Sequence, residues 1–124
     1  MPSEAAVQAP PGYVIVARRA ELPPGTLRGV QVGGAAVVLV NLGGSIHALA
    51  DCCLHRGAPL SQGRLRGGGL VCPWHAWVYD PATGAVRAPR GIPRGLTRYA
   101  VWVAGDLIAV GPPTPAPGTE EDAE

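Results

Sequence analysis

Residues 51–80 read DCCLHRGAPLSQGRLRGGGLVCPWHAWVYD and contain two short motifs, each with one cysteine and one histidine. The first motif is Cys53-Leu54-His55, and the second, sixteen residues later, is Cys72-Pro73-Trp74-His75. Two thiolates and two imidazoles form a four-ligand set for a metal centre, and each motif supplies one ligand of each kind. We therefore expect two loops of the chain to hold one centre between them.

The same four residues could instead hold a single zinc ion, because Cys₂His₂ is also a zinc ligand set. Only one residue separates Cys53 from His55, whereas paired zinc ligands usually leave about two to four residues between them. Cys52 could replace Cys53 as a ligand, but we expect Cys52 to be a small buried neighbour. Three cysteines, two of them adjacent, favour a metal or redox role in a reducing compartment over a disulfide framework.

Short apolar or β-branched segments surround these motifs and predict β-strands. The expected strands are residues 13–17, 27–32, 36–41, 45–50, 70–72, 77–79, 85–87, 97–103 and 107–110. Hairpin signals stand between several of them, namely Gly33-Gly34, Gly43-Gly44, residues 81–84 (PATG) and Gly105-Asp106. Many short strands with close turns predict an all-β fold, an antiparallel sandwich or barrel. Residues 51–70 are the exception, a Gly-rich loop that a metal would order.

The ends of the chain differ in composition from its middle. We expect residues 1–11 to be a disordered segment, residues 12–111 to form one domain, and residues 112–124 to form a disordered, Pro-rich acidic tail. No apolar run approaches the ~20 residues that span a bilayer, and the start lacks the features of a signal peptide. The sequence thus predicts a soluble cytoplasmic protein with no membrane partner.

Charge is unevenly distributed along the sequence. All ten Arg lie in residues 12–111 with four acidic residues, a local balance of +6, and four further acidic residues lie in residues 120–124. A basic body suits an acidic protein partner, although an ordinary solvated surface is the plainer alternative. Nucleic acid is not expected, because the Arg are scattered and the chain has only three Trp and three Tyr.

The two motifs and their flanks carry a family resemblance. Residues 51–63 (DCCLHRGAPLSQG) and 72–80 (CPWHAWVYD), followed by Thr83-Gly84, resemble the two cluster-binding boxes of the Rieske 2Fe-2S family, and most closely those of small soluble Rieske ferredoxins. The resemblance implies an antiparallel β domain with the boxes as loops at its tip, and one 2Fe-2S cluster per chain. It also implies a ligand arrangement: Cys53 and Cys72 would hold the buried iron, and His55 and His75 the outer, more exposed iron.

Several positions depart from the family pattern. Ala76 stands where the second box usually has Gly, so we expect the backbone there to avoid a positive φ. Gly57 and Trp74 replace the disulfide cysteines of high-potential members, and Trp77 replaces their Ser, which leaves Tyr79 as the matching hydroxyl donor. The reduction potential should therefore lie in the lower part of the Rieske range of about −150 to +300 mV, raised slightly by Tyr79. We expect both Trp residues to cover the cluster from water.

The resemblance implies a one-electron carrier that docks through its tip. A ferredoxin of this kind would pass electrons from a flavin-containing reductase to an oxygenase, with Arg56, Arg64 and Arg66 near the docking surface. The alternatives are a small Rieske subunit of a larger reductase complex, such as the one accompanying nitrite reductase, and a redox-sensing or interaction module. Identifying the proteins that accompany this one would distinguish these three functions.

The chain itself is not expected to be an enzyme. Rieske oxygenases carry a second, mononuclear iron held by two His and a carboxylate. Once His55 and His75 bind the cluster, only His47 remains among the three histidines. His47 lies in a strand pattern, and we expect it to be a partly exposed sheet residue.

Overall fold

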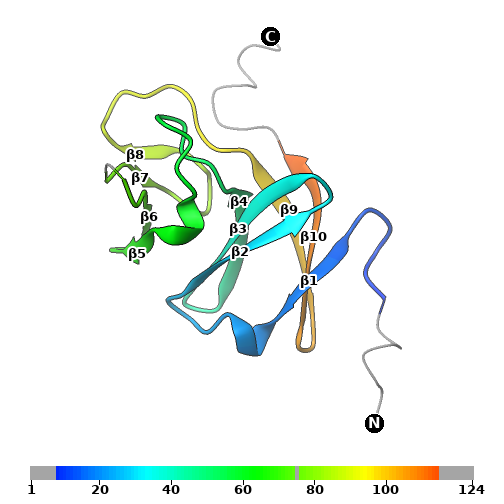
Figure 1. The fold of residues 1–124 in the computed structure, drawn as a ribbon. Coiled ribbons are helices and arrows are strands. Elements are labelled where there is room, and N and C mark those ends of the chain that lie inside the picture. Colours follow the sequence, from blue (N-terminus) through cyan, green and yellow to red (C-terminus); the bar gives the residue numbers. More distant parts are fainter. Residues whose placement is uncertain (1–7, 75, 115–124) are drawn as a thin grey trace.

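The computed structural model describes residues 8–74 and 76–114, which form two antiparallel sheets (Figure 1). The all-β antiparallel fold is thereby confirmed, and each of the nine expected strands overlaps an observed one. The elements of the described residues are β1 (Val14–Arg18), η2 (Arg19–Glu21), β2 (Leu27–Val32), β3 (Ala35–Leu42), β4 (Ser45–Ala50), η3 (Leu60–Gln62), β5 (Arg64–Arg66), β6 (Gly69–Val71), β7 (Val78–Tyr79), β8 (Val86–Ala88), β9 (Arg98–Ala104) and β10 (Leu107–Thr114). No helix in these residues is long and apolar enough to cross a membrane.

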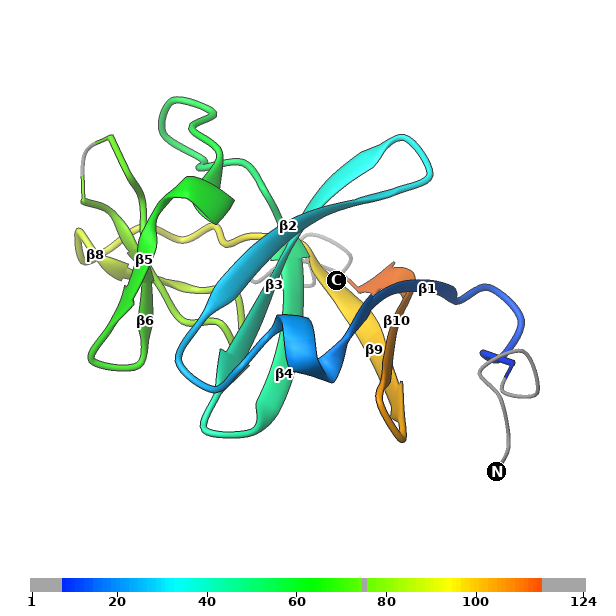
Figure 2. The same cartoon turned by 60° about the horizontal axis from the view of Figure 1, so that its bottom comes forward.

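The larger sheet has six strands in the order β1-β10-β9-β4-β3-β2. Its two end strands, β1 and β2, also contact each other, so the sheet nearly closes into a barrel. The smaller sheet has the order β5-β6-β7-β8 and stands beside the barrel in both views of the ribbon (Figures 1 and 2). We call these parts the barrel and the small sheet.

Strand β3 is buried on both faces and joins the two parts. Val37 and Leu39 pack with residues of the barrel interior, whereas Val38 and Val40 pack with residues of the small sheet and its loops. All four side chains are fully buried. Successive side chains of a strand point to opposite faces, so a continuous apolar run is what a strand between two cores requires.

Glycine residues make the predicted hairpin turns. Gly33, Gly43 and Gly105 have φ values of 61°, 58° and 56°, in the left-handed region. Glycine enters this region without the steric penalty of a Cβ atom, and two-residue hairpins require it. The turns join β2 to β3, β3 to β4, and β9 to β10, as expected from the sequence.

The expectation of a strand-poor loop over residues 51–70 is wrong in its second half. Residues 64–66 form strand β5, which pairs with β6 through a turn at Gly67 and Gly68, where φ is 58° and 77°. The sequence holds the signal for this hairpin, because Arg64-Leu65-Arg66 alternates polar and apolar residues before a Gly-Gly pair. Leu65 packs against the core of the small sheet.

The folded part extends further toward the C-terminus than expected. Strand β10 continues to Thr114, with Pro113 opposite Tyr99 and Thr114 opposite Arg98 on β9. Proline is tolerated there because β10 pairs with β1 only as far as Val110, and the register shifts between Val110 and Pro113. The predicted disorder of residues 1–7 and 115–124 falls outside the described residues.

Candidate metal centre

The first motif lies in a loop that is closed by hydrogen bonds on both sides of Cys53. The Cys53 N–H donates to the Ala58 carbonyl at 2.8 Å, and the Gly57 N–H donates to the Cys53 carbonyl at 2.7 Å. At the start of the loop, the Asp51 carboxylate accepts from the Ser61 N–H and hydroxyl at 2.7 and 2.6 Å. These hydrogen bonds fix the backbone on both sides of Cys53, as far as the start of η3.

The second motif lies in a loop that is closed by one backbone bond. The Cys72 N–H donates to the Trp77 carbonyl at 2.8 Å, which brings together the end of β6 and the start of β7. Ala76, inside this loop, has φ of 58°. The expectation that Ala76 avoids a positive φ is therefore wrong. The loop closes with Ala76 in the left-handed region, which a non-glycine residue adopts at a cost of roughly 1–2 kcal/mol.

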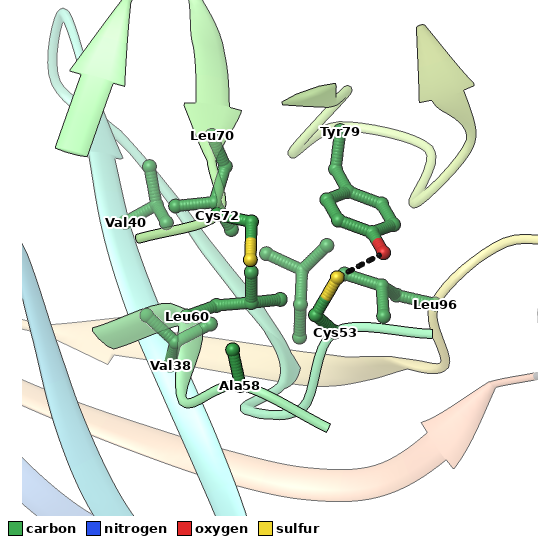
Figure 3. Packing of buried hydrophobic residues seen from close by; sticks show 10 residues of the cluster. Val38, Val40, Cys53, Ala58, Leu60, Leu70, Cys72, Tyr79 and Leu96 are labelled. Carbon is green, nitrogen blue, oxygen red and sulfur yellow. Dashed lines mark hydrogen bonds between the residues drawn. The ribbon is translucent and has the colours of Figure 1, made fainter. Parts of the chain in front are cut away.

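The two cysteines predicted as ligands come together in one hydrophobic cluster. Cys53 and Cys72 are 1% and 2% exposed, and both pack in the core of the small sheet with Tyr79, Leu60 and other apolar residues. Figure 3 shows their sulfur atoms inside this cluster, with that of Cys53 beside the Tyr79 hydroxyl. Neither cysteine forms a disulfide bond.

The structure describes only one of the two histidines predicted as ligands. His55 is exposed, whereas Cys53, two residues earlier in the same loop, is buried. His75 lies outside the described residues. Among the residues described, no three His, Cys, Asp or Glu side chains form a group that could hold a metal ion. The full four-residue ligand set therefore stays a prediction.

Tyr79 connects the small sheet to the first loop through its hydroxyl group. The oxygen accepts the Leu54 N–H at 2.9 Å and lies 3.1 Å from the Cys53 sulfur. Burial raises the pKa of Tyr79 above its usual value, and the hydrogen bond with Cys53 raises the pKa further. The phenol therefore stays protonated, and its O–H is free to donate to a thiolate at Cys53, which can only accept.

The two tryptophans near the centre have different environments. Trp77 is half-buried, and its ring stacks on that of His55 with centroids 4.9 Å apart and planes 1° from parallel. Trp74 is 63% exposed. The structure is consistent with a covering role for Trp77, but most of the Trp74 side chain lies in solvent. The His55 contact had no signal in the sequence, because the two residues are 22 positions apart.

Two further sequence predictions concern residues outside the ligand set. Cys52 is exposed, so the expectation that it is a buried neighbour is wrong; its side chain lies over Gly57 while the adjacent Cys53 points into the core. His47 is half-buried on β4, as expected. Burial lowers the pKa of His47, with Arg98 adding to this effect and Asp80 opposing it.

The three arginines predicted near the docking surface are all exposed. Arg56 follows His55 directly in the first loop. On β5, Arg64 pairs with Val71, the residue before Cys72, whereas Arg66 pairs with Gly69 at the far end of the hairpin. Arg66 is thus farther from the second loop than Arg64 along β5.

A small antiparallel β domain whose sequence carries one Cys/His motif in each of two loops is typical of iron-sulfur proteins with mixed thiolate and imidazole ligation. The family comparison agrees, since residues 12–102 match the model of the Rieske [2Fe-2S] domain. The chain belongs to the Rieske [2Fe-2S] domain family, whose cofactor is a 2Fe-2S cluster.

Curated relatives include both small and large proteins. The ferredoxin component of the naphthalene 1,2-dioxygenase system from Pseudomonas aeruginosa is 33% identical over 91 residues, covering 73% of this chain and 86% of the relative. Apoptosis-inducing factor 3 from Mus musculus is 42% identical over 90 residues, again 73% of this chain, but the chain spans only 15% of that protein. Similarity to the larger relative therefore concerns one domain of it.

Solved structures agree with the fold. The ferredoxin of carbazole 1,9a-dioxygenase from Nocardioides aromaticivorans IC177 is 32% identical with a TM-score of 0.74, covering 81% of this chain and 97% of that one. A chain in the complex of reduced oxygenase and oxidized ferredoxin in carbazole 1,9a-dioxygenase is 30% identical with a TM-score of 0.71, covering 81% and 93%. The strands and loops described above thus follow the fold of solved Rieske ferredoxins.

Proposed function

We propose that the protein is a soluble, cytoplasmic one-electron carrier, the ferredoxin that passes electrons from a flavin-containing reductase to an oxygenase. The observation that carries this proposal is the contrast within one loop between the buried Cys53 and the exposed His55. A ligand set of this kind anchors a redox centre in the protein and still presents one side of it to a partner. The similarity to ferredoxin components of dioxygenase systems supports the same role.

The donor chemistry fits a 2Fe-2S cluster held by Cys53, Cys72, His55 and His75. Two buried thiols from separate loops, neither of them in a disulfide, suit the inner iron, and the exposed imidazole of His55 suits the outer one. When bound, such a cluster supplies one-electron oxidation and reduction. Cys53 and Cys72 would exclude water from the inner side, and Tyr79 would donate a hydrogen bond to the Cys53 sulfur.

Docking would take place at the tip formed by the two loops. Both loops project from the same end of the molecule, away from η2 (Figure 2). Arg56 stands in the first loop, and the ten arginines of residues 12–111 exceed the acidic residues there by six. An acidic patch on the oxygenase or the reductase would complement this charge and steer the encounter.

A stopped-flow experiment with a purified Rieske oxygenase and a flavin reductase tests the proposal. The reduced protein should transfer one electron to the oxygenase at a rate that falls as salt is raised. Arg56→Glu should slow transfer by about tenfold, whereas the control Arg19→Glu, in η2 at the opposite end, should leave it within about twofold. Transfer that ignores salt and both substitutions would contradict docking at the tip.

A further inference from the structure

Trp77 contacts both loops of the proposed cluster site. Its carbonyl accepts the N–H of Cys72 in the second loop, while its ring stacks on His55 of the first loop. The same side chain packs against the hydrophobic cluster that contains both cysteines. Trp77 therefore connects the two loops through two separate contacts, one made by the backbone and one by the ring.

The ring contact has the geometry of an offset stack. The centroids of Trp77 and His55 lie 4.9 Å apart, and the planes differ by 1°. Parallel aromatic rings at this separation overlap in an offset arrangement, which is favoured over a face-to-face sandwich. Rotation of the imidazole out of its plane would break this overlap, so the indole limits the orientation of an otherwise exposed side chain.

We propose that Trp77 is a positioning residue for His55, holding the imidazole plane in the orientation needed to bind the outer iron. The proposal rests on the proposed function, in which His55 is a cluster ligand. Groups that orient a metal-binding histidine usually do so by a hydrogen bond from its second ring nitrogen. Here the face of an aromatic ring orients the imidazole.

Tyr79 makes the corresponding contact with the other ligand of the first loop. Residues 77 and 79 are two positions apart on extended chain, so their side chains leave the backbone on the same side. Tyr79 reaches Cys53, and Trp77 reaches His55, with the two aromatic rings 6.4 Å apart. The second loop and β7 thus hold both ligands of the first loop by successive aromatic side chains.

The simplest competing explanation is that Trp77 only fills space in the core. The two explanations predict different results for smaller side chains at position 77. A positioning role requires an aromatic ring there, whereas a space-filling role requires only an apolar side chain. Trp77→Phe keeps an aromatic face for His55, whereas Trp77→Leu keeps an apolar side chain without one. Neither change removes the backbone bond to Cys72, so the comparison isolates the ring. Trp74→Leu, in the same loop but 63% exposed, is the matched control.

The experiment measures two properties of the cluster-loaded proteins. One is the rate at which iron is released to a ferrous chelator, and the other is the line width of the low-temperature electron paramagnetic resonance spectrum of the reduced state. Removal of a group that orients a metal ligand typically costs about 10–100-fold in metal affinity. We expect Trp77→Leu to release iron about tenfold faster and to broaden the spectrum, because His55 samples more orientations. Trp77→Phe and Trp74→Leu should stay within about threefold of the wild type.

Each outcome separates the inference from the proposed function. Equal losses in Trp77→Phe and Trp77→Leu, or an unchanged Trp77→Leu, would overturn the positioning role while leaving the electron-carrier proposal intact. A wild-type protein without a Rieske spectrum would instead overturn the proposed function. Because both Trp77 variants keep an apolar side chain, the test does not depend on a truncated variant that could fail to fold.

Discussion

The barrel and the small sheet have cores on opposite faces of strand β3 but are stabilised in different ways. The six barrel strands have five to eight residues each and pack an aliphatic interior, whereas the strands of the small sheet have two or three residues. The core of the small sheet includes Cys53, Cys72 and Tyr79. Strands this short supply few ladder hydrogen bonds, so the small sheet depends on its loops, and on the centre that they would hold, for much of its stability.

Removal of the cysteine ligands should produce the largest difference in local stability between the barrel and the small sheet. The double variant Cys53→Ser/Cys72→Ser should lose the cluster, and amide hydrogen exchange in β6 and β7 should rise by about tenfold or more because that core loses its cross-link. Exchange in β3 and β9 of the barrel should change little. Cys52→Ser is the control, since the exposed Cys52 should be dispensable for cluster content. Equal loss of protection in both parts would contradict the comparison.

Leucines of the two cores provide a matched pair. Leu39 in the barrel and Leu60 beside the cysteines are both fully buried. Replacing either by Ala should lower the free energy of unfolding by about 2–5 kcal/mol, measured by denaturant titration. Only Leu60→Ala should also speed iron release, because it opens a cavity beside Cys53 and Cys72. If Leu39→Ala released iron as fast, the two cores would not be independent.

The hydroxyl of Tyr79 should tune the reduction potential. Tyr79→Phe removes the donor to Cys53 and leaves the Leu54 N–H without its acceptor. Fewer hydrogen bonds to the thiolate favour the oxidised cluster, so the potential should fall by about 50 mV, on the order of a tenfold change for a one-electron couple. Protein-film voltammetry measures this shift. Tyr99→Phe, in the barrel, should leave the potential unchanged.

Substitution of Ala76 has the smallest predicted effect, a small change in the free energy of unfolding. Ala76→Gly relieves the steric cost of φ at 58°, and the greater freedom of Gly in the unfolded chain offsets part of that gain. We expect a net stabilisation of about 1 kcal/mol or less, seen as a rise in Tm of about 4 °C. Ala82→Gly in the exposed turn between β7 and β8 has no positive φ to relieve and should be destabilising. A fall in Tm for both variants would mean that Ala76 is not strained.

Local patterns in the sequence were sufficient to predict most of the barrel. Runs such as residues 36–41 and the glycine pairs beside them specify strands and turns through near neighbours alone. The sequence also predicted that Cys53 and Cys72 lie close together, because each motif can be recognised within its own loop, and both are found in one buried cluster. The extension of β10 was missed because its tolerance of proline depends on where the pairing with β1 ends.

The features that the sequence did not reveal depend on contacts between distant segments. The stack of Trp77 on His55 and the bond from Leu54 to Tyr79 arise only once the small sheet packs against the first loop. The conformation of Ala76 follows from closure of the second loop, which overrides the preference of the residue itself. These three features lie at the site, where local preference and overall geometry conflict most.

Low-temperature electron paramagnetic resonance of the dithionite-reduced protein, with iron and acid-labile sulfide counts, tests the central claim most directly. A rhombic spectrum with an average g value below that of the free electron, together with two irons and two sulfides per chain, is the predicted result, because one cluster binds between the two loops. A silent sample that contains one zinc ion per chain would contradict the electron-carrier account and leave a zinc-stabilised β domain.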